Sequence, residues 1–115
     1  MSTEDAAALL AAARADAVQR IAALRGDVTS IVDSASSTTG DDEHDPEGAT
    51  IGFERAQAMA LLAQAEAQLG AVDAALNRLA AGNYGICESC DRAIAAERLA
   101  ARPEATRCIT CAARR

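Results

Sequence analysis

Two long segments of the chain carry apolar residues at alternating steps of three and four, and this spacing constrains the fold more than any other feature. The first seam consists of Ala7, Leu10, Arg14, Ala17, Ile21, Leu24, Val28 and Ile31. The second seam consists of Ile51, Arg55, Ala58, Leu62, Ala65, Leu69, Val72, Leu76 and Leu79. Such steps place the side chains on one stripe of an α-helix, as in a coiled coil. The pattern predicts helices over about residues 4–35 and 51–81.

The segment between the two seams is polar and strongly acidic. Five carboxylates occur within seven residues, in the run Asp41-Asp42-Glu43-His44-Asp45-Pro46-Glu47. Pro46 disfavours helical geometry at Asp45, and Gly48 permits a tight turn, so we expect the chain to reverse in an acidic tip at about 36–50. Because one amphipathic helix cannot bury its stripe alone, residues 1–81 are predicted to form an antiparallel coiled-coil hairpin. An ordinary helix bundle or a homodimeric coiled coil would show the same periodicity.

Composition and charge narrow the class of protein. Phe53 and Tyr84 are the only aromatic residues among 115, which suits narrow helix seams better than a wide core. No apolar run is long enough for a membrane span, and no basic stretch precedes an apolar one at the amino terminus, so we expect a cytoplasmic protein. Residues 1–81 hold thirteen acids against five arginines. This balance disfavours contact with nucleic-acid phosphates and favours a basic protein surface or a metal ion as partner.

All four cysteines lie in two pairs with the pattern C-x2-C-x17-C-x2-C. The pairs are Cys87-Glu88-Ser89-Cys90 and Cys108-Ile109-Thr110-Cys111. Two such pairs can surround one Zn²⁺ tetrahedrally, and four thiolates leave no open position for a catalytic water. Disulfides are disfavoured in the cytoplasm, a redox pair would need a βαβ context, and an iron–sulfur cluster is less typical of this spacing. We predict one structural zinc ion in a small finger over residues 82–115, which ends in a short C-terminal helix.

The cysteine-containing region resembles the DksA/TraR family of C4-type zinc-finger proteins. The resemblance covers residues 82–111 and rests on Gly82-Asn83-Tyr84-Gly85-Ile86-Cys87-Glu88-Ser89-Cys90, Ile94, Glu97-Arg98-Leu99, Ala101-Arg102-Pro103 and Cys108-Ile109-Thr110-Cys111. It implies a transcription regulator that binds RNA polymerase rather than DNA. In that family the hairpin enters the secondary channel of the polymerase, and acidic residues at its tip act near the catalytic centre.

The resemblance also implies which residues of the tip and finger carry the function. The family's tip pattern is Asp-x-x-Asp-x-Ala; Asp42 and Asp45 supply the two aspartates, and Glu47 stands at the alanine position. An alternative register would place Asp45 and Gly48 at the two aspartate positions. We do not predict a response to the alarmone ppGpp.

Arg98 and Arg102 are candidate contacts to the polymerase. Pairing of the finger's arginines with neighbouring acids, such as Glu97 and Glu104, is the alternative.

Two other classes of function remain open at this stage: a nucleic-acid-binding zinc ribbon and a non-catalytic coiled-coil interaction module. The sequence contains no nucleophile–base arrangement, phosphate-binding loop or open metal site, so we do not expect an enzyme. The expected oligomeric state is a monomer.

Overall fold

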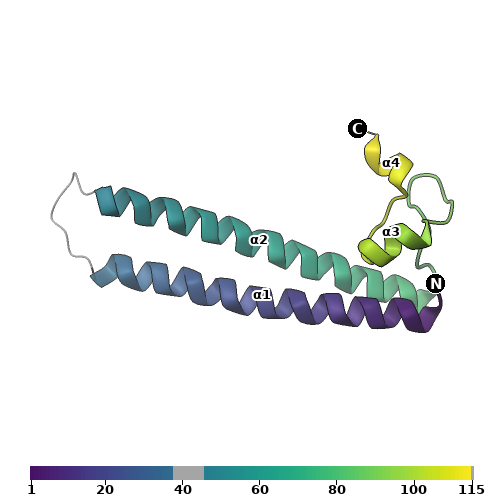
Figure 1. The fold of residues 1–115 in the computed structure, drawn as a ribbon, viewed down its shortest axis with the longest axis horizontal. Coiled ribbons are helices and arrows are strands. Elements are labelled where there is room, and N and C mark those ends of the chain that lie inside the picture. Colours follow the sequence, from purple (N-terminus) through teal and green to yellow (C-terminus); the bar gives the residue numbers. More distant parts are fainter. Residues whose placement is uncertain (38–45, 115) are drawn as a thin grey trace. The chain divides into compact units, whose positions relative to one another are not determined.

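The computed structural model describes the backbone of residues 1–37 and 46–114, with side chains for residues 1–33 and 48–114 (Figure 1). Four helices are present: α1 (Thr3–Ser37), α2 (Pro46–Ala81), α3 (Ala96–Ala101) and α4 (Ile109–Ala113). The described residues contain no strand, only an isolated antiparallel bridge between Ile86 and Ala93. The predicted fold class is confirmed: two long antiparallel helices precede a cysteine-rich finger and a short C-terminal helix. None of the helices is long and apolar enough to cross a membrane within this part of the chain.

The chain divides into two compact units, which we describe separately. The finger unit comprises Met1–Asp16 and Gln68–Arg115, and the central unit comprises Ala17–Ala67. Each unit contains a segment of α1 and a segment of α2. The carboxyl-terminal part of α2 is thus grouped with the cysteine-containing region.

The finger unit has two small hydrophobic clusters. In the first, Leu10 of α1 packs with Val72 and Ala75 of α2, and all three are fully buried. In the second, Cys87 packs with Ile94 and Leu99. Tyr84 contacts both clusters, so its ring ties the helix pair to the finger. Burial of a Leu or Val side chain contributes about 1.5–3 kcal/mol, so few large residues hold this unit together.

The predicted seams are the buried faces of both long helices. Their apolar positions are all buried or half-buried, whereas Arg14 and Arg55 are exposed. In the finger unit Arg14 Nε donates to Asp73 Oδ1 at 2.8 Å. In the central unit the most buried seam residues are Ala17, Ile21, Ala58 and Ala65. Small alanine side chains let the two backbones pack closely with little apolar volume between them.

Local chemistry explains two of the helix ends. At the start of α1, Ser2 Oγ accepts a hydrogen bond from the Asp5 N–H at 3.1 Å, and Asp5 Oδ2 accepts one from the Ser2 N–H at 3.4 Å. This reciprocal pair is a capping box. At the end of α2, Gly82 adopts a φ of 81°, and the Asn83 N–H bonds to the Arg78 carbonyl at 2.8 Å. The left-handed glycine and this backbone bond form a Schellman motif that terminates the helix.

The second long helix begins earlier than the sequence pattern indicated. It starts at Pro46 rather than near residue 51, so the expectation that Gly48 makes the turn is wrong: Gly48 is helical. Proline is favourable at the first helical position because its φ is already fixed and its missing N–H is not needed there. Asp42 and Asp45 lie outside the described residues. Glu47 lies in the first turn of α2, and its side chain is also outside the described set.

Candidate metal centre

The first cysteine pair lies on a short turn held by backbone hydrogen bonds. The Ile94 N–H bonds to the Gly85 carbonyl at 2.7 Å, and the Cys87 N–H bonds to the Arg92 carbonyl at 2.8 Å. Between these paired segments the Asp91 N–H returns to the Cys87 carbonyl at 2.9 Å. Asp91 has a φ of 61°, a left-handed conformation that aspartate tolerates better than most side chains. The turn formed by these bonds therefore contains both Cys87 and Cys90 and holds them close together.

The second cysteine pair lies at the start of α4. Cys108 immediately precedes the helix, and Cys111 lies in its first turn. The Ala112 N–H bonds to the Cys108 carbonyl at 2.9 Å, which fixes the turn between the two cysteines. Residues three apart on a helical turn lie on the same face, so both sulfurs point the same way.

The fold brings the four predicted cysteines together. Their sulfur atoms all lie within 4.8 Å of one another, and the Cys90 and Cys108 sulfurs are 3.9 Å apart. Tetrahedral zinc with Zn–S bonds of about 2.3 Å places its sulfurs about 3.8 Å apart, so this set fits the ion. Among the described residues it is also the one group of three or more potential ligands gathered in this way. One structural Zn²⁺, as predicted, is the cofactor of this site.

Hydrogen bonding distributes protons unequally among the metal-free thiols. The backbone N–H of Cys108 is the main cause that lowers the pKa of Cys87 to about 6. The backbone N–H of Cys111 likewise lowers the pKa of Cys108. In contrast, the hydrogen bond with the Cys108 side chain raises the pKa of Cys111 to about 12. Zinc must displace the remaining protons, so its binding is linked to pH.

The site is buried on one side only. Cys87 is fully buried in the second hydrophobic cluster, Cys108 and Cys111 are half-buried, and Cys90 is exposed. Cys87 therefore serves both as a metal ligand and as a core side chain.

The two candidate polymerase contacts in the finger have different surroundings. Arg98 is half-buried, and its Nε donates to the Arg107 carbonyl at 2.7 Å. Arg102 is exposed and has no side-chain hydrogen bond or ion pair with any described residue. The ion pair of this region joins Arg107 to Glu88 at 3.1 Å. Sequence reasoning missed Glu88; its position next to Cys87, with Arg107 next to Cys108, was the available signal.

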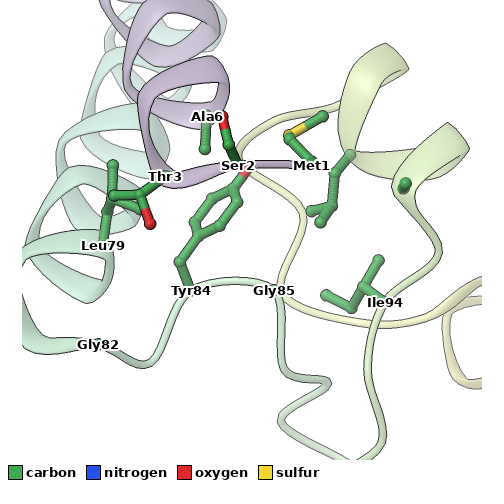
Figure 2. Close-up of a pocket in the computed structure, with 11 residues that line it drawn as sticks. Met1, Ser2, Thr3, Ala6, Leu79, Gly82, Tyr84, Gly85 and Ile94 are labelled. Atoms are coloured by element: carbon green, nitrogen blue, oxygen red, sulfur yellow. The ribbon is translucent and has the colours of Figure 1, made fainter.

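A cavity of about 280 Å³ lies in the finger unit beside Tyr84 (Figure 2). Its lining combines the start of α1, the end of α2 and finger residues such as Ile94 and Leu99. The Tyr84 hydroxyl donates to the Pro103 carbonyl at 2.8 Å, and burial raises the pKa of Tyr84. No carboxylate, imidazole or thiol side chain is among the residues that line this cavity.

The central unit has a groove of about 320 Å³ between its segments of α1 and α2. Leu24, Ile31 and Leu61 provide apolar surface, and Asp27 and Glu54 add carboxylates. Neither carboxylate forms an ion pair within the described part of the chain. The groove therefore combines apolar contact area with negative charge.

Comparison with known proteins agrees with this site and fold. Residues 82–115 match the family model described as the prokaryotic dksA/traR C4-type zinc finger. The solved structure of transcription factor DksA2 from Pseudomonas aeruginosa is similar, with a TM-score of 0.76 and 30% sequence identity. The alignment covers 96% of this chain and 79% of that chain. A search of curated proteins finds no match. A zinc finger of this type, on a fold that 96% of this chain shares with DksA2, shows that the chain belongs to the DksA/TraR family.

Proposed function

We propose that this protein is a transcription regulator that binds RNA polymerase and inserts its acidic segment, the tip at about residues 36–50, into the secondary channel, toward the catalytic centre. The observation that carries the proposal is the likeness to DksA2, a transcription factor, over 96% of this chain. A closed four-cysteine site supports a regulatory rather than an enzymatic role, since zinc with four thiolates has no position for a reacting water.

The distribution of charge supports a partner of opposite sign for the central unit. Residues 17–67 hold nine acids and three arginines, which gives the central unit a net charge of −6. The finger unit holds eight acids and eight arginines and is formally neutral. Carboxylates are suitable ligands or neighbours for Mg²⁺, the metal of nucleotide-transfer sites. The central unit is therefore the part suited to a channel that ends at such a site.

Within this proposal the predicted residues of the acidic segment and of the finger have different roles. Asp42, Asp45 and Glu47 act near the catalytic centre of the polymerase. Arg102, exposed and without a partner in the described structure, is available to an acidic patch on the polymerase. Arg98 is bonded within the finger, and we assign it to internal support rather than to direct contact.

The groove of the central unit provides a second surface for the same partner. Apolar surface from Leu24, Ile31 and Leu61 suits the apolar side of a helix, and Asp27 and Glu54 suit arginine or lysine at its edge. We propose that basic, partly apolar surface of the polymerase packs there.

The test of the proposal is the double variant Asp42→Asn/Asp45→Asn in a purified transcription system. Amide replaces carboxylate at nearly equal volume, so binding to polymerase should persist while the effect on transcription is lost. The matched control is Asp16→Asn/Asp33→Asn, which removes the same charge from two exposed residues of α1. Full activity of the first variant would refute the role of the acidic segment.

A further inference from the structure

The connector between α3 and α4, residues 102–108, contains no helix or strand, and hydrogen bonds hold it in place. Four of its carbonyl groups accept hydrogen bonds from four different parts of the finger unit. The donors are the Tyr84 hydroxyl to Pro103, Arg78 Nη2 to Glu104, the Glu88 N–H to Thr106 and Arg98 Nε to Arg107. The connector delivers Cys108 to the metal centre, so these bonds determine where the second cysteine pair lies.

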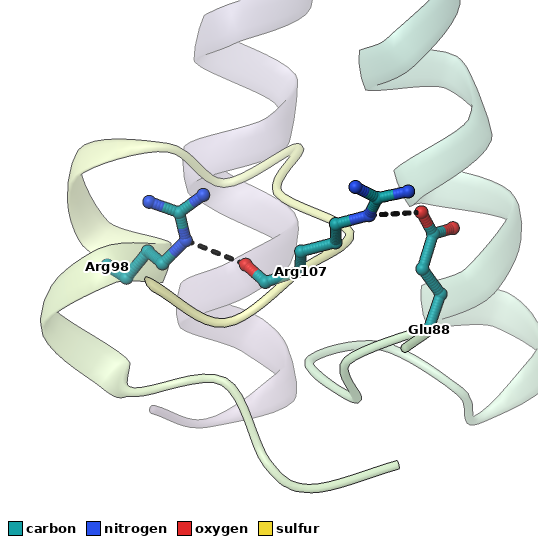
Figure 3. A network of polar contacts seen from close by, with 3 residues as sticks. All are labelled: Glu88, Arg98 and Arg107. Carbon is teal, nitrogen blue, oxygen red and sulfur yellow. Dashed lines mark hydrogen bonds and ion pairs between the residues drawn. The ribbon is translucent and has the colours of Figure 1, made fainter. Parts of the chain in front are cut away.

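Three of the residues around this connector form a chain of contacts next to the zinc ligands (Figure 3). Arg98 donates to the carbonyl of Arg107, whose own guanidinium reaches the carboxylate of Glu88. Glu88 directly follows Cys87, and Arg107 directly precedes Cys108. The Glu88 N–H also bonds to the Thr106 carbonyl at 2.9 Å. One backbone bond and one ion pair therefore join the two cysteine pairs beside the ligands.

The bond from Arg98 acts on the peptide group that links Arg107 to Cys108. Because a peptide group is planar, fixing its carbonyl also fixes the direction of the Cys108 N–H. Arg98 on α3 thus fixes the peptide plane that leads into Cys108, the first ligand of the second cysteine pair.

We propose that Arg98, Arg107 and Glu88 are positioning residues for the metal: they hold the two cysteine pairs in register and slow the release of zinc. Residues that orient metal ligands commonly change metal affinity by factors of about 10 to 100. The Arg107–Glu88 pair is half-exposed, with side-chain exposures of 49% and 55%, so we expect its contribution to zinc retention to fall below this range. This proposal concerns zinc retention and does not depend on polymerase binding.

The experiment measures the rate at which a chromogenic chelator in excess removes zinc from the full chain. Arg98→Met, which keeps the approximate length of the side chain and removes the donor, should release zinc about tenfold faster. Glu88→Gln and Arg107→Gln should each release it about two- to fivefold faster. Arg102→Gln is the matched control, since Arg102 is a nearby exposed arginine without a side-chain partner among the described residues. Its rate of zinc release should equal that of the unmodified protein.

Two further measurements separate positioning from a general loss of stability. The double variant Glu88→Gln/Arg107→Gln should be no faster than the faster single variant, because both lose the same contact. In the cobalt-substituted protein, Arg98→Met should shift the sulfur-to-metal charge-transfer band, while Arg102→Gln leaves it unchanged. Release rates equal to that of Arg102→Gln, strictly multiplicative effects in the double variant, or an unshifted band in Arg98→Met would each overturn the proposal.

Discussion

The finger unit and the central unit are stabilised in different ways. The finger unit is formally neutral, has two buried clusters joined by Tyr84, and holds its irregular segments with a zinc site and many specific hydrogen bonds. The central unit carries the whole net charge of −6, and three of its four buried seam residues are alanine. Its exposed apolar residues include Phe53, which is 74% exposed. Specific contacts fix the geometry of the finger unit, whereas the central unit exposes charge and apolar surface, the part that the proposed function assigns to a partner.

Loss of the zinc ligand Cys87 should produce the largest effect and confine it to the finger unit. Structural zinc contributes on the order of 10 kcal/mol to folding, and Cys87→Ala removes both a ligand and a buried core side chain. Zinc content and amide exchange, read peptide by peptide, check this. Exchange should rise across residues 84–114 and stay low over residues 17–33.

Cys90→Ala gives the matched control, because Cys90 is a ligand that is exposed. It should lose zinc affinity but destabilise the metal-free finger less than Cys87→Ala does. Equal destabilisation by both variants would contradict the dual role of Cys87.

Truncation of a leucine should distinguish the two units by several kcal/mol. Leu10→Ala opens a cavity in a fully buried cluster and should lower the free energy of unfolding by about 2–5 kcal/mol. Leu61→Ala removes a side chain that is 45% exposed in the central unit and should cost about 1 kcal/mol or less. Urea denaturation followed by circular dichroism measures both. Similar losses would show that the central unit has a tighter core than its few buried side chains indicate.

Zinc affinity should fall as the pH falls, by at least tenfold per pH unit. The pKa of metal-free Cys111 is raised to about 12, so its thiol is protonated throughout the working range and must lose that proton to bind zinc. The pKa of Cys87 is lowered to about 6, so below that pH the proton of Cys87 must be displaced as well. The dependence should therefore steepen below about pH 6. Competition titrations with a zinc-specific dye at several pH values check the slope, and an affinity independent of pH would contradict it.

Two features of the molecule were predictable from sequence: the buried faces of the long helices and the metal site. Burial on a helix repeats every three to four residues, so the seams marked the buried faces, and the spacing of four cysteines indicated the metal site. The start of α2 was not predictable in this way. Pro46 and Gly48 suggested a turn, whereas the helix begins at Pro46 itself. The Glu88–Arg107 pair joins residues 19 apart with no local pattern between them, and only the folded finger brings them together.

The most direct test of the account is site-specific crosslinking to RNA polymerase from two positions of the central unit. A photoreactive residue at Asp45 should crosslink to polymerase segments that surround the catalytic centre. The same residue at Phe53, exposed on α2, should crosslink to the wall of the secondary channel. Crosslinks from both positions that fall only on the outer surface of the polymerase, or that do not form at all, would contradict insertion of the acidic segment.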